Sequence, residues 1–155
     1  MLGHTVAVDV RAAVDVPCDA SRLFALIDDL AVYPSWVELV HGALPDTPDR
    51  DGPAWSVELR ARIGPLARSK RLRMVRTQHH PIDGTVVFER REIDGRQHSP
   101  WILRAAVTSG QDGSGSTVQM HLHYGGALWT GGVLERVLSE QISSGSTRLA
   151  ALAST

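Results

Sequence analysis

The side chains best suited to chemistry in this sequence are two guanidinium groups and a phenol that alternate with apolar residues. Arg76 follows Met74 at strand spacing, and Arg90 follows Phe88 in the same way. Residues two apart in a strand point to the same face, so both cations would share an apolar face. A guanidinium there could hold a carboxylate, phenolate or phosphate, and the phenol of Tyr124 could transfer a proton. If the protein is an enzyme, we expect its catalytic residues to be Tyr124, Arg76 and Arg90.

The strand face that Arg68 and Lys70 occupy depends on the turn that precedes them. If Gly64 and Pro65 form a two-residue turn, one face of the next strand carries Arg68, Lys70, Leu72, Met74 and Arg76. A buried unpaired cation is costly, so either these charges lie at the mouth of a cavity or a bulge turns part of the strand over. The third interpretation is a solvated basic surface, paired with Glu58, Glu89 and Glu92.

Two histidines on one predicted strand, His121 and His123, have residue types that could bind zinc. Their parity is opposite to that of the apolar Met120 and Tyr124, so we expect them to face solvent. No nucleophile elbow, phosphate-binding loop or Cys-x-x-Cys motif occurs in the sequence. We therefore expect no metal and no cofactor.

Hydrophobic periodicity predicts the elements that position these groups. Period-two alternation and turn residues predict strands at 5–16, 39–44, 55–63, 66–78, 85–92, 100–108 and 117–124. Helical spacing predicts short helices at 20–30 and 33–37, with Asp19 as an N-cap, and a long helix from about Thr130. The polar, Asp- and Pro-rich stretch 46–53 is typical of a turn or loop.

This order of elements predicts an α+β fold formed by one domain, residues 1–155. Consecutive hairpins favour a seven-stranded antiparallel sheet, and the two short helices fall between the first and second strands. A sheet of this width twists, so we expect it to curve and grip the long C-terminal helix.

The stretch from Asp29 to Trp36, which reads Asp-Leu-Ala-Val-Tyr-Pro-Ser-Trp, resembles a segment of the START-like or helix-grip (SRPBCC) superfamily. The opening Val14-Asp15-Val16-Pro17 and the order of elements resemble the same superfamily, in its polyketide cyclase/dehydrase-like branch. The resemblance implies a cavity between sheet and helix that accepts apolar molecules such as lipids, polyketides or isoprenoid-like compounds. Members range from passive carriers to cyclases, so the fold alone does not decide the function.

Apolar residues on the inward parity, together with Trp36 of the predicted roof, are the expected ligand contacts. This set is Trp36, Trp55, Leu59, Met74, Phe88, Trp101, Leu103, Met120, Tyr124, Ile142 and Gly145. Met suits an adaptable lining and Trp can stack on a flat ligand. A mid-helix glycine costs about 1 kcal/mol against Ala, so Gly145 has either a ligand or a tryptophan packed against it.

The inward face is poor in acid and base groups, which favours binding over catalysis. The alternative is a metal-free polyketide cyclase or aromatase that folds a poly-ketone in the same cavity. A net charge of −1 and the absence of a long apolar run argue against nucleic acid or integral membrane association. One cysteine and no recognisable signal peptide favour the cytoplasm. An exposed edge strand near Leu39 could pair with a second copy to form a homodimer.

Overall fold

The computed structural model describes residues 7–63, 65–111, 114–125 and 133–154. Seven antiparallel strands form one sheet in the order β1-β7-β6-β5-β4-β3-β2. The strands are β1 Val8–Val16, β2 Val40–Asp49, β3 Gly52–Ile63, β4 Leu66–His80, β5 Thr85–Arg90, β6 Trp101–Ser109 and β7 Ser116–Tyr124. The helices are α1 Ala20–Ile27, the 3₁₀ helix η1 Leu30–Ser35, and α2 Val133–Ala153.

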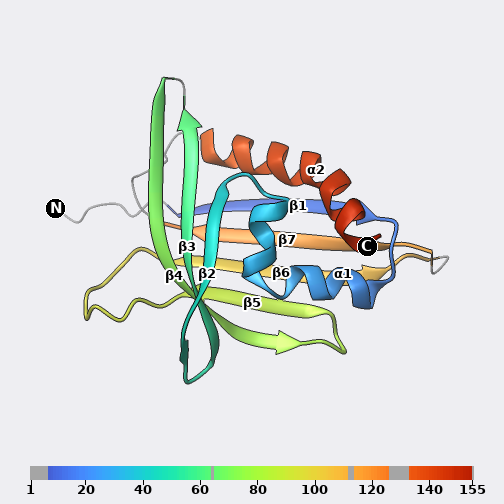
Figure 1. Ribbon diagram of the computed structural model, residues 1–155, viewed down its shortest axis with the longest axis horizontal. Coiled ribbons are helices and arrows are strands. Elements are labelled where there is room, and N and C mark those ends of the chain that lie inside the picture. Colours follow the sequence, from blue (N-terminus) through green and yellow to red (C-terminus); the bar gives the residue numbers. More distant parts are fainter. Residues whose placement is uncertain (1–6, 64, 112–113, 126–132, 155) are drawn as a thin grey trace.

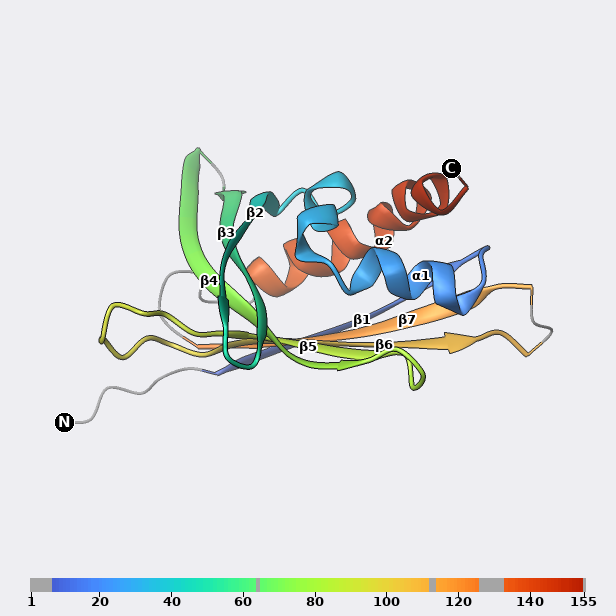
Figure 2. The same cartoon turned by 60° about the horizontal axis from the view of Figure 1, so that its bottom comes forward.

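All three helices lie on one face of the sheet, which we call the inner face (Figures 1 and 2). The long helix α2 packs along β1, and β2, β3 and β4 turn up at one end beside the helices. The α+β fold, the curved seven-stranded sheet and the position of the two short helices are therefore confirmed. The core sits between the inner face and the helices.

Burial follows the predicted alternation in the first strand. Val10, Val14 and Val16 are buried, whereas Asp9 and Arg11 are exposed. The alternation continues across the sheet because directly paired residues of antiparallel strands share a face. The inner face therefore collects the apolar halves of the strands into one core cluster.

The predicted turn or loop at 46–53 is too long, because only residues 50 and 51 form a turn and the rest extends β2 and begins β3. The side chain of Arg73, 8% exposed, donates from Nη2 to the carbonyl oxygen of Thr47 at 2.9 Å. Its guanidinium also lies 3.7 Å from the carboxylate of Asp46 and 3.8 Å from that of Asp49. A side chain on Gly52 would collide with the backbone oxygen of Arg76. These distant contacts hold a Pro- and Asp-rich stretch in a hairpin that local propensity disfavours.

The short helices differ from expectation at their ends. Helix α1 stops at Ile27, and η1 occupies 30–35 rather than 33–37. Asp29 caps η1, because its Oδ1 accepts from the backbone N–H of Ala31 at 3.0 Å. Asp19 stands at the N-cap of α1, but its side chain makes no capping hydrogen bond. The expected start of the long helix at Thr130 lies outside the described residues.

Strand β2 is an edge strand, as its position near Leu39 predicts. Pro45 and Pro48 lie within it and lack amide donors. Such prolines protect an edge from pairing with another chain, so they argue against a dimer through β2.

Candidate ligand-binding cavity

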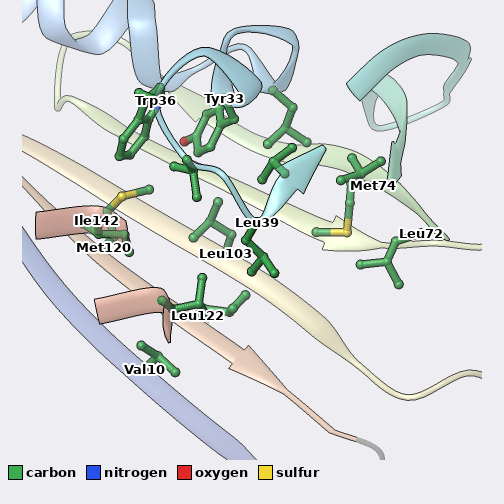
Figure 3. A pocket seen from close by; sticks show the side chains of 15 residues that line it. Val10, Tyr33, Trp36, Leu39, Leu72, Met74, Leu103, Met120, Leu122 and Ile142 are labelled. Carbon is green, nitrogen blue, oxygen red and sulfur yellow. The ribbon is translucent and has the colours of Figure 1, made fainter. Parts of the chain in front are cut away.

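An apolar cavity of about 90 Å³ lies between the inner face of the sheet, α2 and residues 30–40, which we call the roof segment (Figure 3). The roof segment contains η1 and the first residue of β2. The described lining residues are Val10, Leu30, Tyr33, Trp36, Val37, Leu39, Val40, Val57, Leu72, Met74, Leu103, Met120, Leu122, Leu138 and Ile142. Every one of these side chains is aliphatic, aromatic or a thioether, so the cavity favours apolar contents.

Five of the predicted ligand contacts come together around this space. They are Trp36, Met74, Leu103, Met120 and Ile142. Figure 3 shows Trp36 and Tyr33 of the roof segment facing Met120, Leu103 and Leu122 of the sheet. Strands β4, β6 and β7, the roof segment and α2 each contribute one of the five, so the predicted inward parity does converge on one space.

Three predicted contacts, Trp55, Leu59 and Phe88, are buried but lie outside the lining. The Trp55 and Phe88 rings meet edge to face, with centroids 5.6 Å apart, and Phe88 also meets Tyr33 at 6.3 Å. These aromatic side chains pack against one another, and Phe88 contacts the lining residue Tyr33.

Trp101 and Tyr124 also lie outside the lining. They are directly paired across β6 and β7, and their rings stack with centroids 4.7 Å apart and an interplanar angle of 20°. Both are buried. The cross-strand stack occupies the inner face near the end of β7.

Gly145 permits close packing between α2 and the roof segment. A Cβ at this position would lie 2.6 Å from the carbonyl oxygen of Trp36 and 3.0 Å from its Cε3. Of the two sequence interpretations, a tryptophan packed against the glycine is therefore the one observed. Nearby, Oε1 of Gln141 accepts from the backbone N–H of Leu39 at 2.6 Å, so α2 is joined to the roof segment at two points.

The candidate catalytic arginines are engaged elsewhere. Arg76 shares the inner parity of Met74, but its Nη1 donates to the carbonyl oxygen of Asp28 at 3.0 Å. This places a cation at the C-terminus of α1, where it complements the helix dipole. Arg90 donates from Nε to Glu92 Oε2 at 2.7 Å, and its side chain is 8% exposed. Neither guanidinium lines the cavity.

Tyr33 supplies the one hydroxyl group among the described lining residues. Its Oη donates to the carbonyl oxygen of Ile27 at 2.7 Å. Burial raises the pKa of Tyr33 above its usual range, and the nearby carboxylates of Asp28 and Asp29 raise it further. The phenol therefore stays protonated and ties η1 to the end of α1.

Register resolves the position of the two other cations. Strands β3 and β4 pair without interruption from Ala54↔Val75 to the Ile63↔Leu66 pair, so no bulge turns the strand over. Lys70 lies opposite Leu59 on the inner face and is half-buried, whereas Arg68 is exposed. Burial lowers the pKa of Lys70, as does the charge of Arg90. These two cations thus stand at the solvent end of the inner face, beyond the cavity.

Half of the lining residues that are absent from the predicted ligand contacts come from the roof segment. Leu30 is the first residue of η1, and Val37, Leu39 and Val40 lie where the chain passes from η1 into β2. This stretch has neither a helical nor a strand period over enough residues to assign a face. Proximity to Trp36 in the sequence was the available signal.

His121 and His123 lie on the outer face, as their parity predicts, and both contact one carboxylate oxygen of Asp9, at 2.7 and 3.0 Å. These hydrogen bonds lower the pKa of Asp9. No group of three or more His, Cys, Asp or Glu side chains in the described part of the chain is arranged to hold a metal ion.

Among the described helices, none combines the length and apolarity needed to cross a bilayer.

Comparison with known proteins identifies the family. The family described as polyketide cyclase / dehydrase and lipid transport matches residues 7–154. No curated protein matches the chain. Three similar solved structures are a START superfamily protein from Mycobacterium smegmatis, the Zhui aromatase/cyclase from a Streptomyces species, and a protein from Thermus thermophilus.

Identities to these three are low, and the shared fold spans nearly the whole chain. The M. smegmatis protein is 17% identical, with a TM-score of 0.62 and 98% of both chains covered. The aromatase/cyclase is 13% identical, with a TM-score of 0.61 and 96% of this chain and 94% of that chain covered. The T. thermophilus protein is 14% identical, with a TM-score of 0.66 and coverage of 94% and 97%. The chain therefore belongs to the polyketide cyclase / dehydrase and lipid transport family, and it shares its fold with a protein described as a START superfamily member.

Proposed function

We propose that the protein binds an apolar small molecule between the inner face of the sheet, α2 and the roof segment. The observation that carries this proposal is the cavity lining, in which no described side chain is charged and the Tyr33 hydroxyl is already bonded. An empty apolar cavity costs about 24 cal/mol per Å³, so about 90 Å³ corresponds to about 2 kcal/mol that a ligand could recover. The single free thiol, Cys18, is compatible with the cytoplasmic location that we also propose.

A ligand of drug-like or lipid-like size needs more room than the cavity offers. Typical ligand pockets enclose roughly 300–1,000 Å³. We expect binding to enlarge the space through Met74 and Met120, whose side chains repack easily. Movement of the roof segment would add further space, at the expense of its two junctions with α2.

Binding without catalysis is favoured by the position of the acid and base groups. Arg76, Arg90 and Tyr124 all lie outside the lining, and the first two are bonded to Asp28 and Glu92. A cyclase needs a proton donor or acceptor in reach of the bound ketone. The described lining supplies only Tyr33, whose proton is donated to a backbone oxygen.

The test combines ligand identification with a blocked cavity. Native mass spectrometry of the protein purified from its own host is expected to reveal a co-purifying apolar molecule. The substitution Leu103→Trp would fill the cavity and is expected to abolish binding of that molecule. Leu44→Trp, at a side chain 70% exposed on β2, is the matched control and is expected to bind normally. Unchanged binding by Leu103→Trp, with a native circular dichroism spectrum, would disprove the proposed site.

A further inference from the structure

Lys70 is the only lysine of the chain, whose other basic residues are arginine or histidine. It lies on β4 two residues from Leu72, a lining residue, and opposite Leu59 of β3. Alternate residues of a strand stand about 7 Å apart on one face. A flexible four-carbon stem therefore allows the ammonium group to reach the end of the cavity.

The inner face of β4 changes from apolar to charged from Met74 towards Arg68. Met74 and Leu72 line the cavity and are buried, Lys70 is half-buried, and Arg68 is exposed. Such a gradient suits a molecule with an apolar chain and a polar end, because the chain would occupy the cavity and the polar end would meet the ammonium group.

Unlike Arg76 and Arg90, Lys70 makes no hydrogen bond or close ion pair with a described residue. Arg76 donates to Asp28 and Arg90 is paired with Glu92. Glu92 is the acidic group that acts on Lys70, but its Oε2 already accepts from Arg90 Nε and from the backbone N–H of Arg73 at 3.1 Å. The local charge of Lys70, Arg90 and Glu92 together is therefore positive by one unit.

Because Lys70 is half-buried, the lack of a counter-charge beside its ammonium group is energetically unfavourable. Burial and the charge of Arg90 both lower the pKa of Lys70, which means that its protonated form is disfavoured in this position. An anion beside the ammonium group would reverse that penalty through a charge-assisted hydrogen bond.

We propose that Lys70 anchors the carboxylate of an amphipathic ligand whose apolar chain occupies the cavity. The inference rests on the proposed function and narrows the ligand class from apolar molecules in general to long-chain carboxylates. One carboxylate would balance the single positive unit that Lys70, Arg90 and Glu92 leave together.

Dodecanoate and dodecan-1-ol have the same alkyl chain and differ only in the head group. Comparing their affinities therefore distinguishes the contribution of Lys70 from that of the apolar cavity. Isothermal titration of both, below the concentration at which dodecanoate forms micelles, is carried out with the unmodified protein, Lys70→Met and Arg71→Met. Methionine keeps most of the apolar stem and removes the charge. Arg71 is the control, since it lies on the outer face, is mostly exposed and faces Glu58.

Lys70→Met is expected to weaken dodecanoate about tenfold, as for the loss of one hydrogen bond between charged groups, and to leave dodecan-1-ol unchanged. Arg71→Met is expected to change neither affinity. Equal loss of both ligands in Lys70→Met, or loss of neither, would overturn the anchor while leaving the apolar site in place. If neither ligand bound the unmodified protein and Leu103→Trp made no difference to any other apolar ligand, both the anchor and the proposed function would fall.

The single lysine also allows a direct readout. Acylation by a soluble amine-reactive ester, located by peptide mass mapping, reports Lys70 separately from the terminal amine. Dodecanoate is expected to slow acylation of Lys70 several-fold, and an equal occupancy of dodecan-1-ol is expected to slow it less. Equal protection by the two ligands would contradict a contact between the carboxylate and the ammonium group.

Discussion

Replacement of Gly145 by alanine tests the junction between α2 and the roof segment. The new Cβ would lie 2.6 Å from the carbonyl oxygen of Trp36 and 3.0 Å from its Cε3. Overpacking of a tight contact costs about 1–3 kcal/mol, and the better helix propensity of alanine returns about 1 kcal/mol. We therefore expect a net loss of about 1 kcal/mol, or a fall of about 2–4 °C in the midpoint of thermal unfolding.

The control for this substitution is Ser143→Ala, at an exposed position on the same helix. It changes helix propensity without a new contact, so a gain of roughly 0.5 kcal/mol is expected. Both variants are compared by urea unfolding followed by circular dichroism, which gives the free energy of unfolding directly. If Gly145→Ala proved more stable than the unmodified protein, α2 would not approach Trp36 as closely as described, and the glycine would need another explanation.

Three further predictions concern groups around the cavity and the sheet. Arg73→Met is expected to lower the free energy of unfolding by about 2 kcal/mol or more, because the carbonyl of Thr47 loses its buried donor; denaturant unfolding measures this, and a change below about 0.5 kcal/mol would contradict the role given to Arg73. Tyr33→Phe is expected to cost about 1 kcal/mol through loss of the hydrogen bond to Ile27, with ligand affinity changed less than about twofold in titration; a large loss of turnover of a poly-ketone would favour catalysis instead. The lowered pKa of Asp9 means that its stabilising contribution is present above its unfolded value of 3.8 and is lost as pH falls from there through the lowered folded-state pKa. The stability difference from Asp9→Asn should therefore shrink as pH falls below 3.8, and a difference that stays constant there would refute the linkage.

Strand faces were predictable from the sequence because they follow from local geometry. Period-two alternation identifies the apolar side of each strand, which carries Val10, Met74 and Met120, and all three line the cavity. The long helix and the roof with Trp36 were predictable in the same way, since each has its own local pattern or family resemblance.

The hairpin at 46–53 was not predictable, because its stabilising partner comes from far along the chain. Local residues favour a loop, whereas the buried guanidinium of Arg73 donates to the carbonyl of Thr47 from far along the chain. Arg76 and Arg90 had the correct parity for a site, yet their carbonyl and carboxylate partners lie just beyond α1 and beyond β5. Parity predicts the face of a side chain and says nothing about the partner that it meets there.

By itself the sequence determined the order of the elements, the inward parity of the strands and the apolar character of the space that they enclose. The tertiary structure alone decided which inward residues border that space. Trp55 and Phe88 pack against each other outside the lining. Leu72 lines the cavity, and Lys70 stands at the solvent end of the inner face. The physical reason is that sheet curvature and the close approach of α2 at Gly145 depend on contacts between residues distant in the chain, which no local period encodes.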